Sequence, residues 1–356
     1  MKKLLFLSAL FTLTTLGFSS KRTDLYQVIS SHPHDVNKFS SHVDTVYQEG
    51  RLWLVEVKKD APSFVYKYLQ STKGRDLRTY KPQGKLFFAP QDEVKDVLAD
   101  LNLTRIKKDV EALASYKNRS AGSTENKEAQ QFIKKRFLEL GMTVEEPCYR
   151  AGICSVVADK LGSVYPEEVI IVVAHFDSVG KSFAGADDNA SGTAVMMEMA
   201  RVLSSYSNKR TLRFFATNGE ENGLLGAQHY AKQLVDSGKI KNIVLNVTMD
   251  MVGYNSNGII ELETDSKYEA LAQWFNTLAQ TYTKLKTKIT LGAWGSDHVP
   301  FLKAGVSTLL TIEDWSTKTP CYHMECDKPD TLNYNYATEV ARLNTAAVVS
   351  KDLEID

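Results

Sequence analysis

The chain has 356 residues, and 43 Lys and Arg are balanced by 43 Asp and Glu, so the net charge is close to zero. This balance lacks the basic excess that is typical of nucleic-acid-binding domains, and we expect no nucleic-acid partner. The hydrophobic fraction of 43% is ordinary for a globular protein, and the length suits one large domain plus a smaller one.

The first residues combine a short basic start, Met1-Lys2-Lys3, with an apolar run that ends near Leu16. This pattern is typical of a secretory signal peptide, because the run is too short and too interrupted to span a bilayer well. We predict a signal peptide over residues 1–20, and a secreted or periplasmic protein that is not inserted in a membrane after signal removal. The alternative is an N-terminal core helix.

Residues 21–100 look like a separate small α+β unit. Strands are predicted over 51–57, 63–68 and 85–89, a turn over 80–84, and a short helix over 93–101. The unit carries no catalytic constellation. Two interpretations remain open: a propeptide that assists folding or covers a site, and an accessory domain that stays attached.

From residue 101 to 356 strands alternate with helices. We predict helices over 104–114, 126–140, 193–203, 223–234, 267–282 and 336–351, and strands over 143–146, 154–158, 169–174, 211–217, 243–249, 259–262 and 307–312. The continuous apolar run over 169–174 predicts a strand buried on both faces. The expected fold is a three-layer α/β/α sandwich around a central mixed sheet.

The four cysteines form two pairs that are close in sequence, Cys148 with Cys154 and Cys321 with Cys326. An even number of cysteines in an exported chain predicts two local disulfides. The first would tie the tip of a hairpin made by strands 143–146 and 154–158. A structural zinc site is the alternative, although it would favour closer Cys-x-x-Cys spacing, and free cysteines remain possible if the protein is not exported.

Polar side chains follow four of the predicted strands at the points where those strands end. They are His175 and Asp177, then Glu220 and Glu221, then Asp250, and finally Tyr322 and His323; Asp187 and Asp188 add an acidic pair to the first loop. Each alone has a plain explanation, such as a turn or a charge at a helix start. Together, however, they can meet at one edge of the sheet.

Several carboxylates and two imidazoles at one sheet edge need a counter-charge, which a divalent metal ion supplies. Imidazole and carboxylate without thiolate suit zinc in a hydrolytic site. The adjacent pair Glu220-Glu221 allows one carboxylate to bind metal while its neighbour faces the substrate as a base. A bridging carboxylate would allow two ions about 3.5–4 Å apart, as in two-metal hydrolases.

These motifs, in this order, resemble the co-catalytic di-zinc aminopeptidases, a family that includes secreted bacterial leucyl aminopeptidases and is related to glutamate carboxypeptidases and glutaminyl cyclases. The resemblance covers residues from about 103 to the C-terminus and rests on the following matches: His175-x-Asp177-Ser178, Gly185-Ala-Asp-Asp188-x-Ala-Ser-Gly192, Gly219-Glu-Glu221-x-Gly-Leu224-x-Gly226, Met249-Asp250-Met251, Ser296-Asp-His298 and Tyr322-His323 with Asp330-Thr-Leu332. It implies a zinc peptidase catalytic domain over residues 101–356.

The resemblance implies two zinc ions per chain and assigns their ligands. Asp188 matches the carboxylate that bridges both ions. His175 and Asp250 match the other ligands of one ion, and Glu221 and His323 match those of the second.

Three further residues receive roles from the resemblance. Glu220 matches the general base, which takes a proton from a metal-bridged water and passes it to the leaving amine. Asp177 matches the carboxylate that orients the His175 ring. Tyr322 matches a tyrosine that stabilises the oxyanion in some members; the tyrosine and the cysteine pair that other members place near the Ser-Asp-His motif are absent here.

The expected function is therefore a secreted zinc aminopeptidase that hydrolyses the N-terminal bond of peptides with a free N-terminus. Alternatives of the same fold are a single-zinc glutaminyl cyclase and a carboxypeptidase acting on small dipeptides. A binding ectodomain without catalysis is a further alternative, although every ligand position is filled. The sequence leaves open the preferred N-terminal residue and the oligomeric state.

Overall fold

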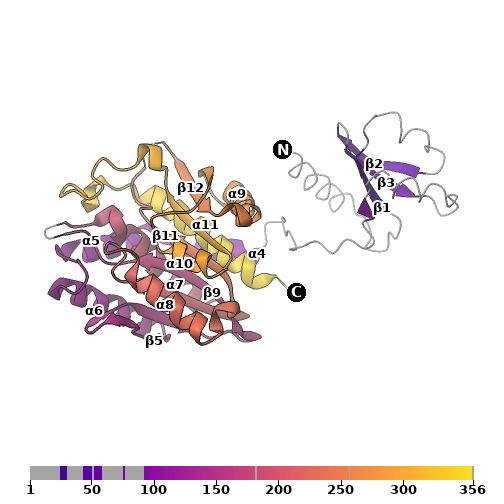
Figure 1. The fold of residues 1–356 in the computed structure, drawn as a ribbon. Coiled ribbons are helices and arrows are strands. Elements are labelled where there is room, and N and C mark those ends of the chain that lie inside the picture. The colour runs from indigo at the N-terminus through magenta and orange to yellow at the C-terminus, as the bar shows by residue number, and fades with distance from the viewer. Residues whose placement is uncertain are drawn as a thin grey trace. The chain divides into compact units, whose positions relative to one another are not determined.

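The computed structural model describes the backbone of residues 25–29, 43–49, 52–57 and 75–76, and residues 92–180, 183–255 and 257–354 in full. The chain divides into two compact units, Met1–Phe88 and Ala89–Asp356, each with its own sheet (Figure 1). The predicted signal peptide over residues 1–20 lies outside the described residues.

The smaller unit contains a four-stranded sheet in its described part. Its strands are β1 (Leu25–Ile29), β2 (Val43–Glu49), β3 (Leu52–Val57) and β4 (Arg75–Asp76), in the order β2-β3-β1-β4. Each neighbouring pair is antiparallel. The strand predicted over 51–57 is confirmed as β3, whereas the strands predicted over 63–68 and 85–89 lie outside the described residues.

The larger unit is built on an eight-stranded sheet with the order β13-β12-β14-β11-β9-β10-β8-β5. Its strands are β5 (Thr143–Glu145), β8 (Val156–Lys160), β9 (Tyr165–His175), β10 (Arg210–Thr217), β11 (Ile243–Met249), β12 (Ile259–Thr264), β13 (Lys286–Leu291) and β14 (Thr308–Glu313). The four central strands, β14, β11, β9 and β10, run parallel, while β12 and β8 are antiparallel to their inner neighbours. The predicted mixed sheet is confirmed.

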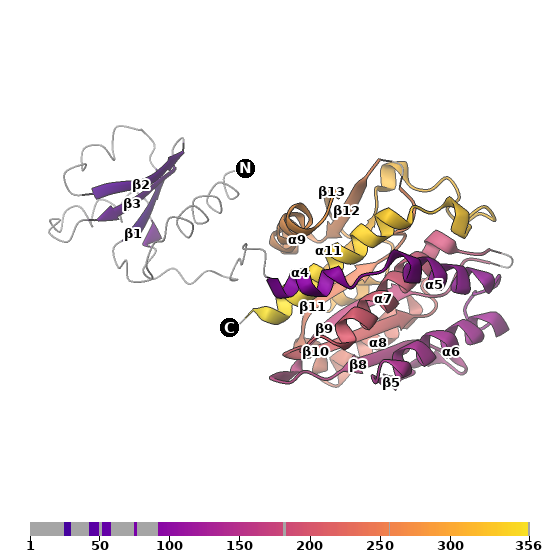
Figure 2. The same ribbon diagram turned by 180° about the vertical axis from the view of Figure 1, so that it is seen from behind.

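Helices cover both faces of this sheet, which gives the predicted three layers. One face carries α8 (Leu225–Asp236) and α10 (His298–Lys303), seen in front in Figure 1. The opposite face, in front in Figure 2, carries α4 (Asp92–Ala99), α5 (Leu103–Ser115), α6 (Thr124–Glu139), α7 (Gly192–Ser204), α9 (Glu269–Tyr282) and α11 (Tyr334–Leu353).

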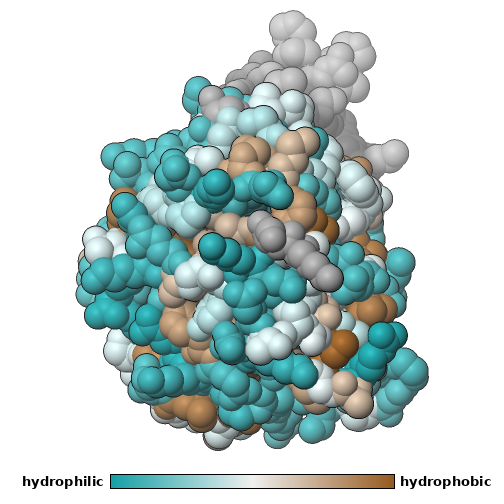
Figure 3. All heavy atoms as spheres, turned by 90° about the vertical axis from the view of Figure 1, so that its left-hand side faces the viewer, coloured by the Kyte–Doolittle hydropathy of each residue, from teal (hydrophilic) through white to brown (hydrophobic). Residues whose placement is uncertain are grey.

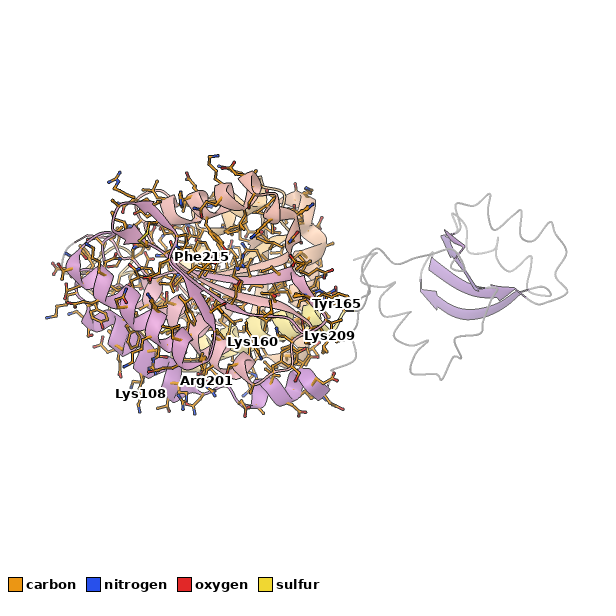
Figure 4. All side chains as sticks on the ribbon, turned by 90° about the horizontal axis from the view of Figure 1, so that it is seen from below. Lys108, Lys160, Tyr165, Arg201, Lys209 and Phe215 are labelled. Atoms are coloured by element: carbon orange, nitrogen blue, oxygen red, sulfur yellow. A yellow bond between two sulfur atoms is a disulfide. The ribbon has the colours of Figure 1, made fainter. Side chains whose placement is uncertain are left out.

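Strand β9 is the centre of the hydrophobic core. Its residues Ile170 to Val173 are fully buried, because helices pack on both of its faces. On the α8 side, the ring of Phe215 lies 4.5 Å from that of Tyr230 and 6.4 Å from that of Phe301, centroid to centroid. Figure 4 shows Phe215 inside the layers, whereas Lys108 and Arg201 lie on the outer helices. The uninterrupted apolar run of this strand follows from that double burial.

The predicted hairpin before β9 is confirmed. β5 pairs with β8 in antiparallel register, and β6 (Cys148–Arg150) pairs with β7 (Ile153–Cys154) at the tip. Cys148 is disulfide-bonded to Cys154, and Cys321 to Cys326, so both predicted local disulfides are present and the structural zinc alternative is excluded for these cysteines.

Three features differ from the sequence prediction. Helix α4 lies in the larger unit and packs against α11, so the structure divides the chain at Phe88 rather than near residue 100. Strand β13 was not predicted, because Lys and Thr alternate along an edge strand that is only half-buried. Helix α10 was also missed; it has six residues and contains Pro300. None of the helices in the described part is both long and apolar enough to cross a bilayer.

Candidate metal centre

The predicted polar residues meet at the carboxyl ends of the parallel strands. His175 is the last residue of β9, Glu220 and Glu221 follow β10, and Asp250 follows β11 directly. Asp188 lies in the turn η1 (Ala186–Ser191) that leads into α7, and its peptide bond to Asn189 is cis. His323 comes from the long loop after β14. Because the four strands are parallel, their ends share one edge, and the structure brings these side chains together as expected.

Asp188 lies between two imidazoles and turns one carboxylate oxygen toward each. Its Oδ1 is 3.3 Å from Nε2 of His175, and its Oδ2 is 3.1 Å from Nε2 of His323. Asp250 Oδ1 also approaches Nε2 of His175, at 3.2 Å, and Glu221 Oε2 approaches Nε2 of His323, at 3.2 Å. The side chains thus form two groups of three that share Asp188, namely His175, Asp188 and Asp250, and Asp188, Glu221 and His323.

The carboxylate of Asp177 is fully buried and lies behind both groups. Its Oδ1 and Oδ2 accept hydrogen bonds from the backbone N–H of Glu220 and Glu221, both at 3.2 Å. On the other side, Nδ1 of His175 lies 3.2 Å from the Asp177 carbonyl oxygen and 3.7 Å from Oδ1. The Asp177 carboxylate therefore holds the Glu220-Glu221 turn through two backbone hydrogen bonds, a contact that the sequence alone does not indicate. The nearer partner of the His175 ring is the Asp177 carbonyl oxygen.

The turn after β10 requires glycine at residue 219. Gly219 has φ of 82°, in the left-handed region that favours glycine. A Cβ atom there would collide with the phenol group of Tyr149, which comes from the disulfide-bonded hairpin. Glycine therefore lets the chain turn sharply before Glu220 and Glu221 and lets the Tyr149 ring approach the backbone closely.

Hydrogen bonds from side chains to the backbone tie the Asp188 turn to the end of β11 and to the loop after it. The amide of Asn189, which is fully buried, donates to Met249 O at 2.9 Å and accepts from Gly192 N–H at 2.8 Å. Asp187 Oδ1 accepts from the N–H groups of Gly253 and Tyr254 at 2.8 and 3.1 Å. These contacts hold the turn with Asp188 and the loop with Asp250 in one rigid arrangement.

Arg119 is fully buried behind the same turn and donates to four backbone carbonyls. Its guanidinium reaches Phe176 O at 2.8 Å, Leu113 O at 2.9 Å, Ala184 O at 2.5 Å and Gly185 O at 2.8 Å. Burial lowers the pKa of this guanidinium to about 10, while the carboxylates of Asp327 and Asp177 oppose that shift. Arg119 therefore joins the end of β9 to the Asp188 turn and places a positive charge near the acidic cluster.

Asp327 and Ser296 hold two of the clustered carboxylates in place. Asp327 accepts the N–H groups of Asp187 at 2.8 Å and Asp188 at 3.1 Å. The hydroxyl of Ser296 donates to Asp250 Oδ2 at 2.7 Å, so that Oδ1 stays turned toward His175. Ser296 stands in one of the matched sequence motifs without a role, and the sequence assigned no role to Asp327 or Arg119.

His323 lies in the short loop closed by the Cys321–Cys326 disulfide. Its backbone has φ of 57°, an unusual conformation for a residue with a side chain. The ring of Tyr322 stacks on the His323 ring at 3.8 Å and packs edge-on against Trp315 at 5.3 Å, centroid to centroid. The disulfide and this aromatic stack keep the imidazole, whose side chain is 36% exposed, turned toward Asp188.

Replacing Cys321 and Cys326 together with Ser is expected to weaken zinc binding at the His323 side of the cluster by about 10–100-fold, the usual effect of losing a group that positions a ligand. The loop would then no longer hold His323 in its strained conformation. Zinc titration with a competing chelator measures the affinity. The matched control is Cys148→Ser with Cys154→Ser, which removes the other disulfide and should leave zinc affinity unchanged. Equal affinities in both variants and the native chain would contradict the prediction.

Burial and neighbouring charges shift the pKa values of the clustered side chains. Burial raises the pKa of Glu220 to about 10 and that of Glu221 to about 7. Hydrogen bonds to Asp188 and Glu221 raise the pKa of His323 to about 10. Burial alone would lower the pKa of His175, but Asp250 and the other carboxylates around it raise it well above its usual value. The clustered side chains therefore favour the binding of a cation between them.

The donor set fits a divalent zinc site. It offers imidazole nitrogens and carboxylate oxygens, which zinc accepts, in two groups whose ligand atoms lie within 4.8 Å of one another. Oε1 of Glu221 is buried and has no hydrogen-bond partner among the described residues, as expected of an oxygen that binds a metal ion.

A cavity of about 340 Å³ opens beside the cluster. Asp188, Glu220, Glu221, Asp250 and His323 line its inner end, and the aromatic side chains Trp294, Trp315 and Tyr322 line its walls. The face shown in Figure 3 is mostly hydrophilic, with scattered hydrophobic residues. A buried acidic cluster that opens into a substrate-sized cavity on a three-layer sandwich is the arrangement of a metallohydrolase.

Comparison with known proteins agrees with this class. The model described as Peptidase family M28 matches residues 155–348. The chain belongs to peptidase family M28. This membership, together with relatives named aminopeptidases and a relative named a probable zinc metalloprotease, supports the predicted enzyme class, a metallo-aminopeptidase.

Two sequence relatives illustrate the similarity. The chain is 35% identical over 187 residues to aminopeptidase YwaD of Bacillus subtilis, a match that covers 51% of this chain and 40% of that protein. It is 30% identical over 274 residues to a probable leucine aminopeptidase of Trichophyton verrucosum, covering 71% of this chain and 74% of the relative.

Solved structures show the same fold. The LapA aminopeptidase of Legionella pneumophila aligns with a TM-score of 0.69 and 19% identity, over 94% of this chain and 99% of that one. A glutaminyl cyclase of Porphyromonas gingivalis aligns with a TM-score of 0.58 and 18% identity, over 70% of this chain and 99% of that one. The fold is thus shared by peptidases and cyclases.

Proposed function

We propose that the protein is an exported aminopeptidase that uses two zinc ions to remove the N-terminal residue of peptides. The observation that carries the proposal is the geometry of Asp188, whose two carboxylate oxygens face two different imidazoles at 3.3 and 3.1 Å. A carboxylate so placed can bridge two ions. In this proposal His175 and Asp250 complete one site, and Glu221 and His323 complete the other.

Zinc bound in these sites would lower the pKa of a water molecule and polarise the peptide carbonyl. Side chains of the protein would supply the proton transfer and the contact to the oxyanion. Glu220 lines the cavity and belongs to a third group of clustered ligand atoms with His175 and Glu221. Since its N–H is anchored on Asp177, its carboxylate is positioned to accept a proton from the attacking water and deliver it to the leaving amine.

Tyr322 is proposed to stabilise the developing oxyanion. Its ring stacks on His323 and lines the cavity, so its hydroxyl group belongs to the wall beside both proposed ion sites. A phenol O–H aimed at that negative charge would act as an electrostatic donor, as in other acyl-transfer sites.

The free α-amine of the substrate is proposed to bind at the acidic inner end of the cavity, among Glu220, Glu221 and Asp250. An ammonium or amine group matches these carboxylates, and its binding there would restrict cleavage to the first peptide bond. A carboxypeptidase would instead need a free cation for the substrate carboxylate. Lys288 is the one Lys or Arg among the residues lining the cavity, and Glu261 and Asp314 already bind it.

Export is proposed on two grounds. The basic start and apolar run of residues 1–16 are typical of a signal peptide. All four cysteines form disulfides, which persist in oxidising compartments. The segment from residue 21 to Phe88, which was expected to extend to residue 100, is proposed to be either a propeptide or an accessory domain, and N-terminal sequencing of the exported protein distinguishes these interpretations.

Elemental analysis of the purified chain, combined with two assays, tests the proposed function. We expect about two zinc ions per chain and release of p-nitroaniline from Leu-p-nitroanilide. One zinc ion with pyroglutamate formation from an N-terminal Gln peptide, and no amide release, would replace the proposal with the cyclase. Absence of both metal and activity, also after removal of the N-terminal unit, would favour a binding domain.

A further inference from the structure

The cavity beside the proposed zinc sites changes in character along its length. Its floor is the α8-side face of the sheet, where Leu310 and Ile312 of β14 lie next to Glu263 and Glu261 of β12. Beyond them, Lys288 and Thr290 of β13 pair with Glu261 and Glu263. A side chain that enters from the zinc end therefore meets apolar residues first and carboxylates next.

The far end of the cavity has an excess of negative charge. Lys288 is the one ammonium there, and it is shared between Glu261 at 3.1 Å and Asp314 at 3.0 Å. Glu261 is further satisfied by the hydroxyl of Thr290 and the backbone N–H of Trp315. Since the Lys288 ammonium already pairs with two other carboxylates, it does not neutralise Glu263.

Glu263 is the carboxylate that can accept a further hydrogen bond. Its side chain is 8% exposed, and Oε1 accepts the N–H of Trp294 at 3.0 Å and lies 3.1 Å from Nε2 of His298. Its other oxygen, Oε2, has no hydrogen-bond partner among the residues that the structure describes in full. Because Glu263 lines the cavity, this oxygen can accept a hydrogen bond from a donor that enters the cavity.

The aromatic wall of the cavity also accepts cations. Trp294 packs edge-on against Trp315, and Nζ of Lys318 lies 4.4 Å from the Trp315 ring centroid and 5.8 Å from that of Tyr322. Lys318 already occupies the face of Trp315, so the exposed ring of Trp294 beside it is the aromatic surface open to a substrate cation.

We infer that Glu263, supported by Glu261, makes the cavity selective for peptides whose N-terminal residue is Arg or Lys. The aliphatic stem would pack on Leu310 and Ile312, and the charged head would reach Oε2 of Glu263, an arrangement that long cationic side chains adopt readily. This inference rests on the proposed aminopeptidase function and names its substrate class.

The test measures kcat/KM of the zinc-loaded full chain on p-nitroanilides of Arg, citrulline, Lys, norleucine and Leu. Citrulline and norleucine have nearly the shapes of Arg and Lys without the charge. We expect the native chain to favour Arg over citrulline and Lys over norleucine by about 10–100-fold, the effect of one charge-assisted hydrogen bond. A native chain that cleaves the neutral member of either pair equally well would overturn the inference.

A variant locates the effect at Glu263. Glu263→Gln should reduce the Arg-to-citrulline ratio to within about threefold while leaving the Leu substrate little changed. Glu269→Gln is the matched control, because it removes the same charge from an exposed position on α9 and should keep the native ratio. An unchanged ratio in Glu263→Gln would also overturn the inference, whereas failure to cleave any of the five substrates would contradict the proposed function itself.

Discussion

Glu220→Gln is expected to lower kcat by about 100- to 10,000-fold, the range typical of a lost general base. Gln has nearly the same shape as Glu and keeps the backbone N–H that Asp177 binds at 3.2 Å, so the turn should stay intact. The amide, however, cannot accept a proton from water. Steady-state kinetics on Leu-p-nitroanilide or Arg-p-nitroanilide, with zinc measured in the same preparation, checks this expectation.

The zinc content of the variant distinguishes the loss of a general base from the loss of a metal ligand. Because Glu220 is proposed to face the substrate rather than an ion, the variant should bind as much zinc as the native chain. Glu167→Gln is a suitable control, since Glu167 is exposed at the far end of β9, and it should keep kcat within about twofold. If Glu220→Gln kept more than about a tenth of the native kcat, another group would have to act as the base.

Asp188→Asn should remove zinc from both sites, reducing the content from about two ions to below one. Asp188 is the residue shared by the two ligand groups, and each of its oxygens faces a different imidazole. Asn offers a single neutral oxygen, which cannot bridge two cations. His323→Ala, which affects one group alone, is the matched comparison and should lose about one ion.

Thermal unfolding gives a second measure of the same substitution. The native chain should gain stability when zinc is added, because zinc binds the folded form and relieves repulsion among clustered carboxylates. Asp188→Asn should lose most of that gain, because it removes the carboxylate that both ligand groups share. A variant that retained two ions and the full zinc-dependent rise in Tm would contradict the bridging role.

Much of the fold was predictable because burial leaves a clear pattern in the sequence. Strand β9 shows an unbroken apolar run, and the polar residues directly after β9, β10 and β11 marked the edge where a site could form. Edge strand β13 lacks such a pattern, since its residues are no more than half-buried. The order of strands, with β14 between β11 and β12, depends on tertiary pairing that no local pattern records.

The residues that support the candidate site were harder to foresee. Arg119 follows a helix in a polar stretch, where an arginine is usually exposed, and only the fold reveals that it is buried against four carbonyl oxygens. Asp327 likewise acts on backbone N–H groups 139 and 140 residues away. The acidic end of the cavity was unpredictable for the same reason: Glu263 comes from β12, whereas the apolar floor beside it comes from β14.

The position of β14 also bears on how the chain is made. This strand pairs with β11 on one side and β12 on the other, yet it is synthesised after both. Until residue 313 has emerged, β11 and β12 each have an open edge, and such edges readily pair with other chains. His323 arrives later still. A chain truncated before residue 313 is therefore prone to pair with other chains, and one that ends before residue 323 lacks part of the proposed second zinc site.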